Sequence, residues 1–237
     1  SLPTVKCVPA SDFYQVDNDG MSHQPEAGRL AITRNWLYNG NLIHVSGNVT
    51  KETTRTLSIY NSKDFFFHTF INRLKAKGIE AKTTAFADCP ESDSLNVVTP
   101  LFTLQRPIEE VLKQMMKESD NLCAESMFYH MAMNYTQRKR VSDNDGTDAV
   151  NHFIKEKLGL NPDYYNIVDG SGASLYNYIS PRLLLEYLKY AYYHADIFQP
   201  FYEALPIAGV DGTLEHRMKK GKAYRNGHAK TGTVTGV

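Results

Sequence analysis

The 237-residue chain is predicted to adopt an α+β fold. Before residues 50 to 60, apolar and polar side chains alternate, which is the pattern of half-buried strands. After them, apolar residues recur at helical spacing between capping signals. Strands and helices that occur in separate runs favour α+β over alternating α/β architecture.

Two strands joined by a tight turn are expected first. The turn signal is Asn39-Gly40, a pair that adopts positive backbone angles easily. The alternating apolar residues on its two sides are Leu30, Ile32, Ile43, Val45 and Val49. A further strand is expected over Thr56–Tyr60, where Leu57 and Ile59 would share one face.

Helices are expected after these strands, each marked by a capping residue, a first-turn proline or a terminal glycine. The expected boundaries are Ser62 to Gly78, a start at Pro107, Thr147 to Gly159, and a start at Ser180-Pro181. Residues Arg225–Val237 are rich in Thr, Val and Gly and lack helical periodicity, which predicts a strand with its approach. The polar stretch Asp88–Asn96 is expected to be a surface loop.

Composition excludes several classes of function. The net charge is zero, so no basic field exists to hold nucleic acid. Cys7, Cys89 and Cys123 are few and widely spaced, which indicates small buried side chains rather than a disulfide framework. The eight histidines show no metal-ligand spacing, so neither a metal nor another cofactor is expected. No transmembrane segment is expected, because no apolar run is long enough, and no signal peptide is expected at Ser1.

The tripeptide Ser119-Asp120-Asn121 is a first candidate for chemistry. It lies between a helix ending at Glu118 and another starting near Leu122. A short loop between helices can direct a hydroxyl and a carboxamide into a cleft. The alternative is a helix N-cap, for which Ser, Asp and Asn are all favoured. Both can hold if Asp120 caps the helix while its neighbours face a cleft.

A second candidate is Lys230-Thr231-Gly232-Thr233 on the expected last strand. Because strand side chains alternate, Lys230 and Gly232 would share one face, with Thr231 and Thr233 on the other. A glycine-bearing edge lets a substrate backbone approach closely, while the ammonium and hydroxyls can bind a carboxylate. The alternative is an exposed edge lysine beside a turn glycine.

A third patch, Asp169-Gly170-Ser171-Gly172-Ala173-Ser174, is rich in glycine. No register of it fits G-x-S-x-G, so an α/β-hydrolase nucleophile is excluded. Its glycines are expected to allow a tight backbone path into the helix after Pro181. A phosphate-binding loop is also excluded at Gly221-Lys222-Ala223, which lacks the hydroxyl residue and the upstream glycine.

In this order, S-D-N and K-T-G are the second and third motifs of serine enzymes that react with penicillins. Residues 168–181, 205–214 and 229–236 add further blocks in matching order. Together they resemble the D-alanyl-D-alanine carboxypeptidases of the low-molecular-mass, class C penicillin-binding proteins. No serine of the chain is followed three residues later by lysine, so the S-x-x-K motif is not among these residues.

The resemblance implies a penicillin-binding transpeptidase-like fold, incomplete in this chain, with helices packed on an antiparallel sheet. Residues 1–52 would be the C-terminal part of an inserted β-rich domain, and residues 53–237 part of the catalytic domain. The S-x-x-K segment would then lie upstream of Ser1, and the chain would be a fragment that is inactive alone.

The resemblance also implies serine-type D-Ala-D-Ala carboxypeptidase activity on peptidoglycan stem peptides, through an acyl-enzyme that β-lactams also form. Endopeptidase activity on cross-links is a further option. Ser119 would hydrogen-bond the base and pass a proton to the leaving amine, and Asn121 would hold the substrate's acyl-side amide. Lys230 would supply positive charge. The expected substrate-binding residues are Thr231, Gly232 and Thr233, with the Thr233 N–H in the oxyanion hole.

Two other functions share these motifs. A β-lactamase or esterase-like relative would use the same site on other acyl groups, and a non-catalytic module would only bind peptidoglycan. The resemblance implies a periplasmic or exported location, and the sequence predicts no oligomeric state.

Overall fold

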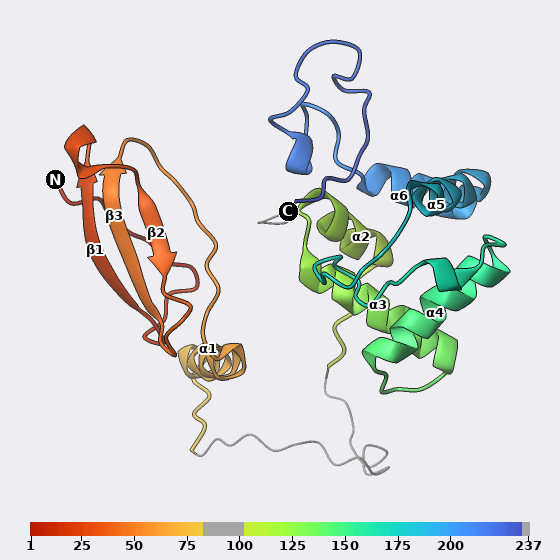
Figure 1. Ribbon diagram of the computed structural model, residues 1–237. Coiled ribbons are helices and arrows are strands. Elements are labelled where there is room, and N and C mark those ends of the chain that lie inside the picture. Colours follow the sequence, from red (N-terminus) through yellow and green to blue (C-terminus); the bar gives the residue numbers. More distant parts are fainter. Residues whose placement is uncertain (83–101, 234–237) are drawn as a thin grey trace. The chain divides into compact units, whose positions relative to one another are not determined.

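A computed structural model describes residues 1–82 and 102–233 of the chain (Figure 1). The chain divides into two compact units, Ser1–Val98 and Thr99–Val237. The described part of the first unit holds a three-stranded sheet and one α-helix, and that of the second holds five α-helices. The predicted α+β content is therefore confirmed. The expected loop at Asp88–Asn96 lies outside the described residues.

The sheet of the first unit has the order β1-β3-β2, so β3 is the central strand (Figure 1). β3 pairs in parallel with β1 and antiparallel with β2. The bounds are β1 Gln15–Ser22, β2 Ala31–Arg34 and β3 Leu42–Val49. The two strands predicted around Asn39-Gly40 are confirmed as β2 and β3, but the tight turn is not: residues 35–41 connect the strands, and neither Asn39 nor Gly40 has a positive φ. Val45 of β3, opposite Ile32, is only 4% exposed and marks the apolar side of the sheet.

Strand β1 has no counterpart among the sequence predictions. Its sequence is mostly polar, with the turn-forming run Asp17-Asn18-Asp19-Gly20 at its centre. Only Gly20 is buried. The strand forms because β3 offers a free edge whose backbone groups need partners, not because β1 carries an apolar face.

The prediction of a strand at Thr56–Tyr60 is wrong. Side chains, rather than a neighbouring strand, satisfy the backbone of this segment. The Arg34 guanidinium donates to the Ser58 carbonyl at 2.7 Å. The Asn41 carboxamide donates to the Tyr60 carbonyl at 3.1 Å and accepts from the Tyr60 N–H at 2.7 Å. Side-chain partners of this kind replace the ladder that a strand would require.

Helix α1, Ser62–Ala76, carries the predicted apolar stripe but begins one residue differently. Its cap is Asn61, whose side chain accepts from the Asp64 N–H at 3.2 Å, and not Ser62. The Phe65 ring lies 5.4 Å from the ring of Phe13, which precedes β1. The helix thus packs within the first unit. The domain boundary expected between residues 52 and 53 stays a prediction.

The helices of the second unit pack pairwise, α3 on α4, α2 on α6 and α5 on α6. Their bounds are α2 Ile108–Lys117, α3 Asn121–Thr136, α4 Asp143–Glu156, α5 Pro181–Tyr193 and α6 Ala195–Ala204. The buried core joins α3, α4 and α5 through the side chains of Phe128, Val150, Ile154 and Leu183. These helices present the loops that carry the sequence motifs.

The predicted start of α4 at Thr147 is wrong. The helix begins at Asp143, and its cap is Ser142, which forms a reciprocal capping box with Asp145. Thr147 lies inside the helix and donates its hydroxyl to the Ile167 carbonyl at 2.9 Å. The capping box satisfies two helix-terminal N–H groups, which extends the helix by one turn before Thr147.

The predicted start of α5 is confirmed, because the Ser180 hydroxyl accepts from the Leu183 N–H at 3.2 Å and Pro181 occupies the first turn. Helix α6 was not predicted. It contains Pro200, which normally interrupts a helix, so its sequence gives no clear helical signal.

The strand predicted at Arg225–Val237 is not present within its described part, Arg225–Thr233. This segment forms only an isolated bridge between His228 and Ile207. The Ala229 N–H donates to the Pro206 carbonyl at 3.1 Å, and the His228 ring stacks on Tyr202 of α6. An antiparallel sheet was expected beneath the helices, whereas the strands within residues 1–82 and 102–233 form a mixed sheet in the first unit.

Candidate functional site

The Ser119-Asp120-Asn121 loop joins α2 to α3. Asp120 is the N-cap of α3, and its carboxylate accepts from the Cys123 N–H at 3.0 Å. The Gln114 carboxamide donates to the same carboxylate at 3.2 Å. These two hydrogen bonds, the first above all, lower the pKa of Asp120. The predicted cap is therefore confirmed, and Asp120 anchors the loop.

Ser119 adopts a left-handed backbone conformation with φ of 57°. This region is strained for a residue with a Cβ, by about 1–3 kcal/mol. The Asp120 N–H donates back to the Met115 carbonyl at 3.2 Å, which closes the end of α2 around Ser119. The sharp reversal leaves Ser119 exposed between two helices that are fixed by their caps and packing.

Lys230 lies beside Ser119 although 111 residues separate them in the chain. Its ammonium donates to the Ser119 hydroxyl oxygen at 2.7 Å and to the Thr231 carbonyl at 2.7 Å. Partial burial lowers the pKa of Lys230. The two tripeptide motifs thus meet in one place through a charge-assisted hydrogen bond.

The remaining candidate residues lie next to this contact. The Thr231 hydroxyl donates to the Thr213 hydroxyl oxygen at 2.9 Å. Gly232 and Thr233 follow it and are exposed, and Asn121, also exposed, is the first residue of α3. The strand expected at Lys230–Thr233 is not formed in the structure.

The glycine-rich block packs against α3 one turn beyond Asn121. The Glu125 carboxylate of α3 accepts from the Gly170 N–H at 3.0 Å and the Ser171 N–H at 3.1 Å. The Asp169 carboxylate accepts from the N–H groups of Gly172 and Ser174, both at 2.6 Å. The tight backbone path expected from these glycines is confirmed.

Sequence reasoning missed Glu125 and Lys117. Glu125 is four residues after Asn121, which places both on one helix face, so its involvement could have been suspected. Lys117 donates to Asp211 at 2.7 Å. Nothing in the local sequence of Lys117 identifies a partner 94 residues away.

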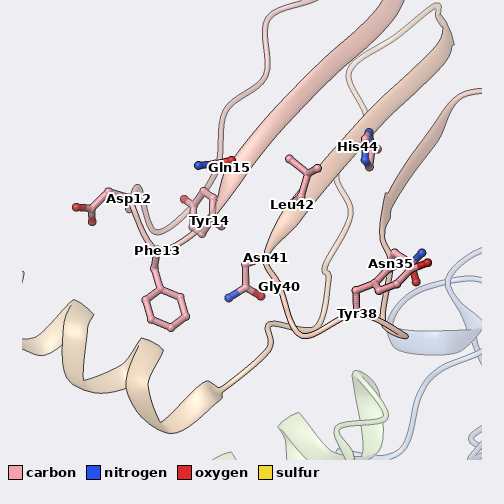
Figure 2. Close-up of a pocket in the computed structure, with 10 residues that line it drawn as sticks. All are labelled: Asp12, Phe13, Tyr14, Gln15, Asn35, Tyr38, Gly40, Asn41, Leu42 and His44. Atoms are coloured by element: carbon pink, nitrogen blue, oxygen red, sulfur yellow. The ribbon is translucent and has the colours of Figure 1, made fainter.

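Two hollows of the surface are lined by residues other than those of the motifs. One, of about 530 Å³, is in the first unit (Figure 2). Two of the polar side chains that line it already have partners, since Asn41 binds Tyr60 and His44 pairs with Asp17 at 3.1 Å. The other, of about 520 Å³, lies around Asp163 and Tyr178 in the second unit. Neither hollow contains a residue of the two motifs.

Three further observations concern the described residues alone. No cluster of three or more His, Cys, Asp or Glu side chains among them is arranged to hold a metal ion. Cys7 and Cys123 are half-buried free thiols, while Cys89 lies outside the described residues. None of the helices in this part of the chain has the length and apolarity needed to cross a membrane.

Replacing Asp120 with alanine is expected to lower the free energy of unfolding at neutral pH by about 0.5–2 kcal/mol, because the first turn of α3 loses its cap. The folded-state pKa of Asp120 is lowered, so the carboxylate stabilises the fold above its ordinary pKa of 3.8 and less as the pH falls through the folded value. Urea unfolding from pH 7 downward should show the difference between wild type and variant shrinking in acid. A difference that is constant with pH would contradict this role.

Comparison with known proteins supports a common origin over nearly the whole chain. Residues 2–237 match the sequence model of the D-Ala-D-Ala carboxypeptidase 3 (S13) family. D-alanyl-D-alanine carboxypeptidase DacB of Haemophilus influenzae is 38% identical over 136 residues, which are 56% of this chain and 28% of that protein. Penicillin-sensitive carboxypeptidase A of Dictyostelium discoideum is 30% identical over 188 residues, 77% of this chain and 34% of that protein.

Solved structures that are similar to this chain come from the same group of proteins as these relatives. Penicillin binding protein 4 (dacB) from Haemophilus influenzae, complexed with a novel beta-lactam, matches with a TM-score of 0.62 and 28% identity. This match covers 96% of the chain and 52% of that structure. A second crystal structure of the same protein gives a TM-score of 0.59 at 26% identity, over 94% of the chain and 49% of that structure.

The chain therefore spans about half of the solved structures, and 28% and 34% of the two curated relatives. The expected resemblance to low-molecular-mass penicillin-binding proteins is confirmed. The chain belongs to the D-Ala-D-Ala carboxypeptidase 3 (S13) family.

Proposed function

We propose that the full-length protein is a serine-type D-Ala-D-Ala carboxypeptidase that acts on peptidoglycan stem peptides and is inhibited by β-lactams. The observation that carries this proposal is the 2.7 Å hydrogen bond between Lys230 and Ser119, within a family of carboxypeptidases. A hydroxyl and an ammonium held together can move a proton and bind an anionic peptide end.

The reaction divides into two acyl transfers. A serine hydroxyl from an S-x-x-K segment, which these 237 residues do not contain, attacks the carbonyl carbon between the two terminal D-alanines. The C–N bond breaks, the acyl group remains on the serine oxygen as an ester, and the terminal D-alanine leaves as an amine after gaining a proton in place of the one that the serine lost. Water then attacks the ester carbonyl and regenerates the serine. Activity on cross-links would follow the same steps with a longer leaving group.

Ser119 is suited to the proton transfer. Its oxygen accepts from Lys230, so its own O–H is free to donate to the nitrogen of the leaving amine. The Lys230 charge would also lower the pKa of a neighbouring lysine base, which favours the neutral form that removes the serine proton.

Substrate binding is assigned to the residues that surround this contact. The hydroxyls of Thr231 and Thr233 would bind the terminal carboxylate, while Gly232 leaves room for the peptide backbone. The Thr233 N–H would serve as one oxyanion donor, a contribution typically of about 3–4 kcal/mol to the barrier. Asn121 would hold the amide on the acyl side of the substrate.

The proposal also includes the domain organisation and the cellular location of the full-length protein. Residues 1–52 would complete an inserted β-rich domain, and residues 53–237 would form part of the catalytic domain. Because peptidoglycan lies outside the cytoplasm, the full-length protein would be periplasmic or exported.

Incubation with a fluorescent penicillin tests this function. The full-length protein should be labelled covalently and should release D-alanine from a peptide ending in D-Ala-D-Ala. The 237-residue chain should stay unlabelled, as should full-length protein first saturated with unlabelled penicillin. Label on the 237-residue chain would contradict a nucleophile outside it. Rapid release of the label would point to a β-lactamase, and a full-length protein that neither reacts nor releases D-alanine would exclude the proposed enzyme.

A further inference from the structure

A segment outside both tripeptide motifs connects them. Lys117 is the last residue of α2 and lies two positions before Ser119. Its ammonium donates to the Asp211 carboxylate at 2.7 Å and to the Leu205 carbonyl at 3.0 Å. The Lys117 side chain is 20% exposed, so this ion pair is partly shielded from water. The end of α2 is thereby fastened to residues 205–211.

Asp211 is held at its other oxygen as well. That oxygen accepts from the Ile207 N–H at 2.8 Å, which fixes the carboxylate plane. Burial alone would raise the pKa of Asp211, but the hydrogen bonds from Lys117 and Ile207 and the Lys117 charge lower it on balance. The carboxylate is therefore charged near neutral pH and bound on both sides.

The next two residues carry the connection onward. Gly212 has φ of 54° and lies so close to α2 that a Cβ would stand 2.7 Å from the Lys117 carbonyl oxygen. Thr213 follows, and its hydroxyl oxygen accepts from the Thr231 hydroxyl at 2.9 Å. Thr231 is adjacent to Lys230, whose ammonium donates to the Ser119 hydroxyl oxygen.

These contacts form a closed ring through three segments of the second unit. It passes from Lys117 to Asp211, along the chain to Thr213, then through Thr231 and Lys230 to Ser119. We propose that Lys117 and Asp211 are positioning residues, which set where the Ser119 hydroxyl lies relative to Lys230 and Thr231 during acyl transfer. This inference rests on the proposed function.

The geometry of the loop explains why position is sensitive here. Ser119 is in a strained conformation that persists only while both ends of its loop are fixed. Asp120 fixes the α3 end through its cap. Lys117 fixes the α2 end through Asp211. Release of that end lets Ser119 relax, and a displacement of about 1 Å in a reacting group can lower a rate by about 100-fold.

The test uses the full-length protein and a fluorescent penicillin, with the rate constant of acylation measured per titrated site. Lys117→Met and Asp211→Asn are expected to lower the saturating rate constant at least about 10-fold while the final label per molecule is unchanged. Thr213→Val removes one hydroxyl without changing size and is expected to act in the same direction. Lys117→Arg keeps the charge and the donors and should recover most of the rate.

Lys113→Met is the matched control. Lys113 lies one turn earlier on α2, and its ammonium pairs with Glu203 of α6 at 3.6 Å, with both side chains about half exposed. It has no place in the ring, so its rate constant should stay within about 2-fold of wild type.

The possible outcomes distinguish failure of the positioning role of Lys117 and Asp211 from failure of the proposed carboxypeptidase function. Rate constants per titrated site that equal wild type in Lys117→Met, Asp211→Asn and Thr213→Val, even with lowered melting temperatures, would show a structural role only and overturn the inference. Should Lys117→Met or Asp211→Asn fail to fold, Thr213→Val decides, because a wild-type rate constant in that variant would overturn the inference. Absence of label on the unmodified full-length protein is a different result, which would overturn the proposed function itself.

Discussion

Replacing Ser119 with alanine in the full-length protein is expected to lower the rate of penicillin acylation by about 10²–10⁴-fold, the usual range for loss of a proton-transferring group. The variant lacks the hydroxyl that accepts from Lys230 and that, under the proposed function, donates a proton to the leaving amine. Binding should change much less, since the carboxylate is assigned to Thr231 and Thr233. Stopped-flow measurement of acylation over a range of penicillin concentrations separates the saturating rate constant from binding.

Ser126→Ala is the control for this prediction. Ser126 lies on α3, is exposed, and donates its hydroxyl to the Leu122 carbonyl of its own helix at 2.7 Å. The substitution removes the same kind of atom at a position outside the site, so the rate should match wild type. Equal rates for Ser119→Ala and wild type would exclude Ser119 from the reaction.

The second large effect is expected at Gly170. A Cβ at this position would stand 2.4 Å from the Ala124 carbonyl oxygen and 2.8 Å from the Phe128 Cβ. Since backbone cannot yield as a flexible side chain does, Gly170→Ala should push the block off α3 and weaken its hydrogen bonds to Glu125. The expected loss in the free energy of unfolding is about 1–3 kcal/mol.

Denaturant unfolding of the full-length protein measures this loss. Gly40→Ala is a suitable control, because a Cβ there meets no atom within 4 Å and the residue has no left-handed conformation. Its effect should stay within about 0.5 kcal/mol. If the two variants have the same stability, the close contact between the glycine-rich block and α3 does not exist in the protein.

Local signals predicted much of the fold. Ser180-Pro181 marks the start of α5, and Asp120 caps α3, because both depend on residues only a few positions away. Strand β1 could not be predicted, since its own residues are polar and the free edge of β3 stabilises it. The prediction of a strand at Thr56–Tyr60 is wrong for the opposite reason. The segment has the apolar alternation of a strand, but it has no strand partner, and side chains bind its backbone instead.

The candidate site also has one part that the sequence predicted and one part that it could not predict. The order of S-D-N and K-T-G indicated that Ser119 and Lys230 belong together, and the structure has their side chains 2.7 Å apart. Their catalytic roles stay predictions. The connection between Lys117 and Asp211 could not be predicted, because each residue alone is an ordinary polar side chain. Only the fold brings the two side chains together, because 94 residues separate them in the chain.

A double-mutant cycle tests most directly whether the two motifs form a single catalytic unit. The acylation rate would be measured for wild-type full-length protein, Ser119→Ala, Lys230→Met and the variant with both changes. If one hydrogen-bonded pair carries the proton transfer, the second substitution should add little to the first, so the coupling energy should approach the smaller of the two single effects. Effects of the two substitutions that simply multiply would show that Ser119 and Lys230 act independently, which would contradict a shared role in proton transfer.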